Sequence, residues 1–127
     1  MRQLVADAAT LADWFTTDAA PLRAEYESGT LRLVEPRSVA ADLVAELATR
    51  IEAAPETLSA VADEIDRLGF DLRDPATRDV ARWVAGGLDP RRAAYAAVAE
   101  AHDLTLATDD AELRRAVGPR AGASTEA

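Results

Sequence analysis

Residues 90–117, PRRAAYAAVAEAHDLTLATDDAELRRAV, contain the pattern that decides the fold of this chain. Asp89–Pro90 is a helix start signal, an N-cap residue followed by a first-turn proline, and it predicts an alanine-rich helix over 91–102. A short apolar strand over 104–107 comes next, and a last helix over 110–117 follows it. A helix that leads into a strand and then into a helix is typical of α/β folds with a parallel sheet.

The rest of the chain repeats this alternation. Three further apolar runs of strand length occupy residues 3–6, 30–34 and 70–72. Apolar residues recur at helical spacing around Leu11–Phe15, around Pro21–Tyr26, over 37–52, from Pro55 to Gly69, and from Asp74–Pro75 to Gly86–Gly87. The expected buried stripes of the later helices are Val80, Trp83 and Val84, and then Ala94, Val98 and Ala101. These patterns predict a three-layer α/β/α domain over residues 1–117, with a parallel sheet of four to five strands, and a flexible C-terminal tail over 118–127.

Length and composition limit the classes of protein to consider. The chain has 127 residues, enough for one domain, and 49% of them are hydrophobic, enough for a core. No apolar run approaches the roughly 20 residues that a membrane-spanning helix needs. The opening residues MRQLVAD do not have the pattern of a signal peptide, so we expect a cytoplasmic protein. The absence of cysteine excludes disulfides and thiolate metal sites.

The charge of the chain narrows the choice of partner. There are 23 acidic and 14 basic side chains, for a net charge of -9, and every basic residue is an arginine. General nucleic-acid coating depends on clustered positive charge, which this chain lacks. The overall field instead favours a basic protein partner or a metal ion.

Three aspartates are expected at one edge of the sheet. Asp7 directly follows the first strand, Asp110 follows the last, and Asp42 lies near the start of the helix after the second strand. In parallel sheets the ligand site lies beyond the carboxyl ends of the strands. Like charges about 4 Å apart repel by roughly 1 kcal/mol in water and roughly 4 kcal/mol at an effective dielectric of 20. A hard divalent cation, Mg²⁺ or Mn²⁺, would relieve that repulsion.

A simpler interpretation also applies to aspartates after strands. An aspartate in that place is often only a helix N-cap, and this is the role expected of Asp74, Asp89 and Asp109. For a single aspartate, capping is the better explanation. The equivalent positions of Asp7 and Asp110 together favour a shared site.

Three segments resemble PIN domains, the nuclease fold that includes VapC-type toxins. VADAATLADWF (5–15) resembles the opening strand and aspartate of that family. LVEPRSVAADLVAEL (33–47) resembles its second strand, proline and acid-bearing helix, with Asp42 where the family usually has glutamate. RRAAYAAVAEAHDLTLATDDAEL (91–113) resembles its C-terminal signature, in which Thr108 and Asp110 occupy the Thr-x-Asp turn. The resemblance spans residues 2–117.

This resemblance implies a metal-dependent endoribonuclease, the toxin of a toxin–antitoxin pair. Asp7, Asp42 and Asp110 would be its catalytic acids and would hold Mg²⁺ or Mn²⁺. It also implies an RNA substrate, an antitoxin whose basic segment covers the acidic site, and a homodimer.

The chain departs from the family pattern in two places. The third family acid falls at Arg92, and the small hydroxyl residue usual after the first aspartate is replaced by Ala9. Arg92 either turns outward, so that Asp89 or Asp109 supports the metal, or occupies the site as a built-in counter-ion. The second arrangement predicts a degenerate PIN domain that binds a protein partner or RNA without cleaving it. A receiver-like signalling domain is a third reading, but it needs a lysine and the chain has none.

Overall fold

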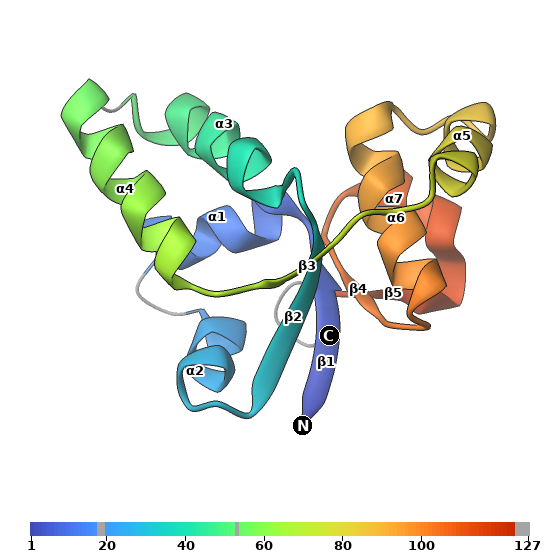
Figure 1. Cartoon of the computed structure of the whole chain (residues 1–127), viewed down its shortest axis with the longest axis horizontal. Helices are drawn as coiled ribbons and strands as arrows, with labels where there is room; N and C mark the ends of the chain where they lie inside the picture. The colour runs from blue at the N-terminus through green and yellow to red at the C-terminus, as the bar shows by residue number, and fades with distance from the viewer. Residues whose placement is uncertain (18–19, 53, 124–127) are drawn as a thin grey trace.

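A computed structural model of the protein describes residues 1–17, 20–52 and 54–123. Among these residues, five strands form one sheet in the order β3-β2-β1-β4-β5, and every neighbouring pair is parallel. Helices cover both faces of the sheet (Figure 1). The predicted three-layer α/β/α architecture and its parallel sheet are therefore confirmed.

The elements alternate along the chain as the apolar patterns predict. The strands are β1 (Arg2–Ala6), β2 (Leu31–Pro36), β3 (Asp71–Arg73), β4 (Leu106–Ala107) and β5 (Ala121–Gly122). One face of the sheet carries α1 (Ala8–Thr16), α2 (Pro21–Glu27), α3 (Val39–Ile51) and α4 (Pro55–Arg67). The other face carries α5 (Thr77–Ala85), α6 (Pro90–Ala101) and α7 (Ala111–Val117), the last followed by the short 3-10 helix η1 (Gly118–Arg120).

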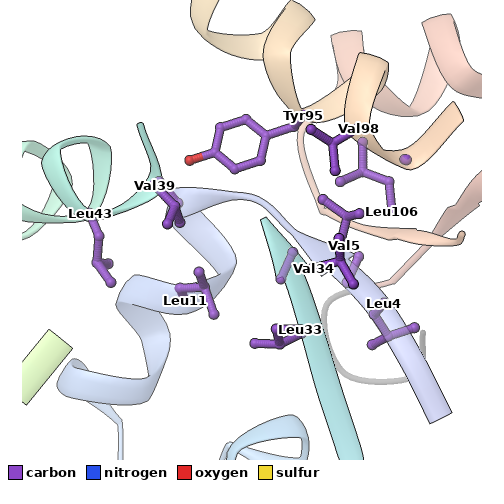
Figure 2. Packing of buried hydrophobic residues seen from close by; sticks show 14 of the residues in the cluster. Leu4, Val5, Leu11, Leu33, Val34, Val39, Leu43, Tyr95, Val98 and Leu106 are labelled. Carbon is purple, nitrogen blue, oxygen red and sulfur yellow. The ribbon is translucent and has the colours of Figure 1, made fainter. Parts of the chain in front are cut away.

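The core lies on both faces of the sheet, around the central strand β1 and its neighbours β2 and β4. In Figure 2, Leu33 of β2 lies on the same side as Leu11 of α1 and Leu43 of α3. Val98 of α6 packs near Leu106 on the other side, and all five of these side chains are buried. Side chains alternate between the two faces of a strand, so these strands contribute apolar residues to the helix layers on both sides of the sheet.

Helix α6 buries more residues than the predicted stripe of Ala94, Val98 and Ala101. Val98 is buried as expected, but Ala94 is only partly buried and Ala101 is exposed. The buried residues are instead Ala93, Tyr95, Ala96, Ala97, Val98 and Ala99. Because alanine side chains are short, they allow the helix backbone to approach the sheet closely over a wide face.

The start and packing of α5 differ from the prediction. Asp74 is not its N-cap: the helix begins at Thr77, and the capping position is Ala76, whose side chain cannot cap. The Asp74 carboxylate instead pairs with Arg37 at 3.0 Å. No residue of α5 is fully buried, and Val84 is 39% exposed. The helix packs mainly on α6 and not on the sheet, which explains its shallow burial.

The predicted domain boundary at residue 117 falls too early. Ala121–Gly122 forms β5, which pairs with β4 and continues the sheet. The Gly122 carbonyl also accepts the Thr108 N–H at 2.9 Å, next to the candidate site. Residues 118–122 therefore belong to the domain, and the last four residues of the predicted tail, 124–127, lie outside the described residues.

Candidate functional site

Asp7 and Asp110 occupy equivalent places at the carboxyl edge of the sheet, as predicted. Asp7 caps α1 and accepts the Thr10 N–H at 2.9 Å, and Asp110 caps α7 and accepts the Leu113 N–H at 2.9 Å. Their strands are neighbours, with Ala6 of β1 paired in parallel with β4. Each aspartate therefore caps a helix, and both also line one cleft. The N-cap expected at Asp109 is wrong, because Asp110 holds that role.

Thr108 joins the two aspartates. Its hydroxyl donates to Asp7 Oδ2 and accepts the Asp110 N–H at 3.0 Å. The Thr108 side chain is fully buried, and the exposed fraction of Asp7 is 6%. Thr108 was predicted to support the site. Its hydroxyl holds the buried Asp7 carboxylate and the backbone N–H of Asp110, the residue that caps α7.

The environments of the two carboxylates differ. Burial is the main cause that raises the pKa of Asp7; hydrogen bonds from Thr10 and Thr108 oppose it, and the charge of Asp110 adds to it. At Asp110 burial also acts to raise the pKa, but the hydrogen bonds from Arg92 and the Leu113 N–H outweigh it, so the pKa is lowered. Among the causes that lower the pKa of Asp110, the hydrogen bond from Arg92 is the largest.

Arg92 lies between two helix caps. Its Nε and Nη2 donate to Asp110 Oδ2 at 2.9 and 2.8 Å, and its Nη1 pairs with Asp89. The Arg92 side chain is 38% exposed. Its pKa is raised, first by the hydrogen bond to Asp110 and then by that to Asp89. Of the two arrangements left open by the sequence, the structure has the second: Arg92 points into the acidic site as a counter-ion and does not turn outward.

Asp42 is held by a separate set of contacts. It is 7% exposed at the start of α3, where its Oδ2 accepts the hydroxyls of Tyr95 at 2.9 Å and of Ser38 at 3.2 Å. Its Oδ1 lies 3.2 Å from Arg91 Nε. Figure 2 shows the Tyr95 ring extending from α6 across the end of the sheet toward α3. Asp42 therefore links the helices of the two layers, a role that its place in the sequence did not reveal.

An open cleft of about 340 Å³ lies at this edge of the sheet. Four acidic and two basic side chains line it, together with apolar and aromatic groups: Asp7, Ala8, Ala9, Glu46, Asp89, Arg91, Arg92, Tyr95, Asp110 and Leu113. The structure thus brings Asp7, Asp89, Arg92 and Asp110 together. Thr108 and Asp42 contact residues of the cleft without lining it, and the exposed Asp109 lines a neighbouring hollow.

The side chains present do not fit a divalent cation in this arrangement. Mg²⁺ and Mn²⁺ need several oxygen ligands, at about 2.1 Å for Mg²⁺. The Asp110 carboxylate is already bound by Arg92, and the Asp42 carboxylate is already bound by Tyr95 and Arg91. Across the described ranges of the chain, no group of three or more His, Cys, Asp or Glu side chains could hold a metal ion.

Glu35 is a buried acid that the sequence analysis missed. Its side chain is fully buried on β2, its Oε2 accepts the Ala6 N–H at 2.9 Å, and its Oε1 has no hydrogen-bond partner among the described residues. Burial raises the pKa of Glu35 well above its usual value, and the nearby charge of Asp7 raises it further. The signal was present in the sequence, because Glu35 follows Leu31 and Leu33 at the inward period of two.

Comparison with known proteins does not assign this chain to a family. No protein-family model matches the chain, and no curated protein matches its sequence. Within the part of the chain that the structure describes, no helix has both the length and the apolar character to cross a membrane.

Proposed function

We propose that this chain is a PIN-like domain that binds a cationic segment of a protein partner in its acidic cleft and does not cleave RNA. The single observation that carries the proposal is the Arg92 guanidinium bound to Asp110 and Asp89. A guanidinium in place of a carboxylate reverses the sign of the interaction with a metal ion. The resemblance to PIN domains over residues 2–117 supports the class of domain.

The charge of the cleft supports a cationic partner. Its lining has four carboxylates against two guanidinium groups, so it stays negative after Arg92 is paired. The chain as a whole carries a net charge of -9, which attracts basic segments and repels nucleic acid. Glu46 lines the cleft on its α3 side, and its Oε1 accepts a hydrogen bond from Arg50 Nε at 3.3 Å. An incoming arginine or lysine can therefore pair with Glu46 alongside Arg50 or in its place.

A second candidate is the metal-dependent endoribonuclease of a toxin–antitoxin pair, with Mg²⁺ or Mn²⁺ as cofactor. The arrangement of Asp7, Thr108 and Asp110 favours it, because two carboxylates meet at neighbouring strand ends in an open cleft. The side chain of Arg92 would have to leave Asp110 before those carboxylates could share a cation. This requirement places the nuclease second.

A cleavage assay separates the two candidates. We expect that the wild-type protein, incubated with a structured RNA and Mn²⁺, releases no more product than Asp7→Asn. Cleavage by the wild type that Asp7→Asn abolishes would establish the nuclease and overturn the first candidate.

A binding assay tests the cationic partner. The probe is a fluorescein-labelled peptide of alternating arginine and alanine, followed by fluorescence anisotropy. We expect salt-dependent binding that weakens about two- to fivefold in Glu46→Gln, a loss of one partly exposed ion pair. The matched control is Glu56→Gln, on an exposed position of α4 outside the cleft. Equal affinities of the two variants, or tighter binding of RNA than of the peptide, would contradict the assignment.

A further inference from the structure

Arg92 connects two helix N-termini through their capping residues. Asp89 caps α6 by accepting the Arg92 N–H at 2.9 Å, and Asp110 caps α7 by accepting the Leu113 N–H. The Arg92 guanidinium then contacts the second oxygen of each of these carboxylates, Oδ2 in both cases. One cationic side chain therefore pairs with two capping carboxylates that belong to different helices.

The carboxylates of this cleft need a positive charge. The charge of Asp110 acts to raise the pKa of Asp7, as a small addition to the effect of burial. Asp89 lines the same cleft, and its pKa is lowered, first by the backbone N–H of Arg92 and then, against the effect of burial, by the Arg92 side chain. Without Arg92, two ionised capping groups and a buried carboxyl would share one edge of the sheet with no neutralising contact at Asp110.

We propose that Arg92 supplies the charge that a divalent cation would otherwise bring to such a cleft, and so holds α6 and α7 together without metal. The contacts support this role in geometry as well as charge. The guanidinium is planar and offers donors along two edges, so it can face two carboxylates at once, which an ammonium group does less well. The inference does not depend on which macromolecular partner the cleft binds, since its tests use neither peptide nor RNA.

Thermal unfolding tests whether Arg92 holds α6 and α7 together. The variant is Arg92→Gln, and the matched control is Arg78→Gln, an exposed arginine of α5 that does not line the cleft. We expect Arg92→Gln to lower Tm by about 3–6 °C and the control to stay within about 1 °C of the wild type. We also expect the wild-type Tm to be the same in EDTA and in MnCl₂. An equal Tm for Arg92→Gln and Arg78→Gln would overturn the inference.

Mn²⁺ binding tests whether Arg92 takes the place of a divalent cation. The binding is monitored through the electron paramagnetic resonance signal of the free ion. We expect no more Mn²⁺ bound by the wild type than by Asp7→Asn. Arg92→Asp is expected to bind at least tenfold more tightly than the wild type and to gain Tm on addition of Mn²⁺. If Arg92→Asp does not fold, Arg92→Gln replaces it, with a smaller gain in Mn²⁺ affinity expected. Binding by the wild type that Asp7→Asn removes, or no gain in either Arg92 variant, would overturn the inference.

Discussion

The Arg92 guanidinium and the Asp110 carboxylate meet at the carboxyl edge of the sheet, where Nε and Nη2 of the arginine both donate to Oδ2 of the aspartate at 2.9 and 2.8 Å. In the proposed function, this pair is the feature that distinguishes the chain from a metal-dependent nuclease. The same two residues also tie α6 to α7, so the pair has a structural effect that can be measured without a ligand.

A double-mutant cycle on Arg92→Gln and Asp110→Asn is expected to show coupling. Asparagine keeps the capping oxygen of Asp110, so the cycle isolates the ion pair and not the helix cap. Because the Arg92 side chain is 38% exposed, we expect a coupling energy of about 0.5–1.5 kcal/mol in urea unfolding at low salt, reduced at high salt. Additive effects of the two substitutions would mean that the contact contributes nothing to stability.

Tyr95→Phe is expected to destabilise the protein by about 1–3 kcal/mol. The phenol donates to the buried Asp42 at 2.9 Å, and removing the hydroxyl leaves that carboxylate with the weaker contacts of Arg91 and Ser38. In the background of Asp42→Ala the same substitution should cost much less, because the acceptor is already gone. Chemical denaturation of the four proteins measures this difference, and an unchanged cost in the Asp42→Ala background would show that the contact is not formed.

Thr108→Val is expected to cost about 2–4 kcal/mol, and Thr108→Ser about 1 kcal/mol. Valine has nearly the same shape but removes the donor to Asp7 and the acceptor for the Asp110 N–H, both at a fully buried position. Serine keeps the hydroxyl and gives up one methyl group. Equilibrium unfolding in urea ranks the two variants, and a larger cost for serine than for valine would show that packing, not the hydroxyl, sets the role of Thr108.

Glu35 makes stability depend on pH in a direction that can be worked out. Its carboxyl accepts the Ala6 N–H at 2.9 Å and interacts electrostatically with Asp7, Tyr26 and Tyr95, none of which is a cation. Its folded-state pKa is raised well above the usual 4.5. The folded protein therefore keeps a proton that the unfolded chain releases, so this contribution is complete below about pH 4.5 and is lost as pH rises toward the folded pKa.

Glu35→Gln should remove that dependence. The amide oxygen can still accept the Ala6 N–H, and no proton is lost on unfolding. We expect the free energy of unfolding of the variant, relative to the wild type, to rise between about pH 5 and pH 8. Glu112→Gln, at an exposed position of α7, is the control and should follow the wild-type profile. A constant difference between Glu35→Gln and the wild type across this range would contradict a protonated Glu35.

Much of the fold could be predicted because it depends on periodicity. The apolar alternation and helix stop signals placed the first four strands to within about two residues, and the equivalent ends of β1 and β4 followed from parallel pairing. The two-residue strand β5 was missed, because Ala121–Gly122 carries no apolar pattern and is recruited only by pairing with β4. Its place in the sheet is a tertiary effect that local sequence does not encode.

The sequence predicted which side chains gather at the site but not which of them contact one another. Strand ends identified Asp7 and Asp110, while the choice between a counter-ion and an outward-turned Arg92 depended on a side-chain conformation. Asp42 was assigned to the metal from its position and from the family resemblance, and its partners in the structure include Tyr95 and Arg91, which come from a helix far along the chain. Spacing along a sequence indicates which side chains reach one edge of a sheet, but it does not indicate which of them pair there.

The most direct measurement is the anomalous scattering of a crystal grown with Mn²⁺ at neutral pH. The proposed role of Arg92 predicts its guanidinium on Asp110 and Asp89, with no anomalous peak in the cleft. A peak held by Asp7 and Asp110, with the Arg92 side chain turned out to solvent, would contradict that role and restore the metal-dependent nuclease.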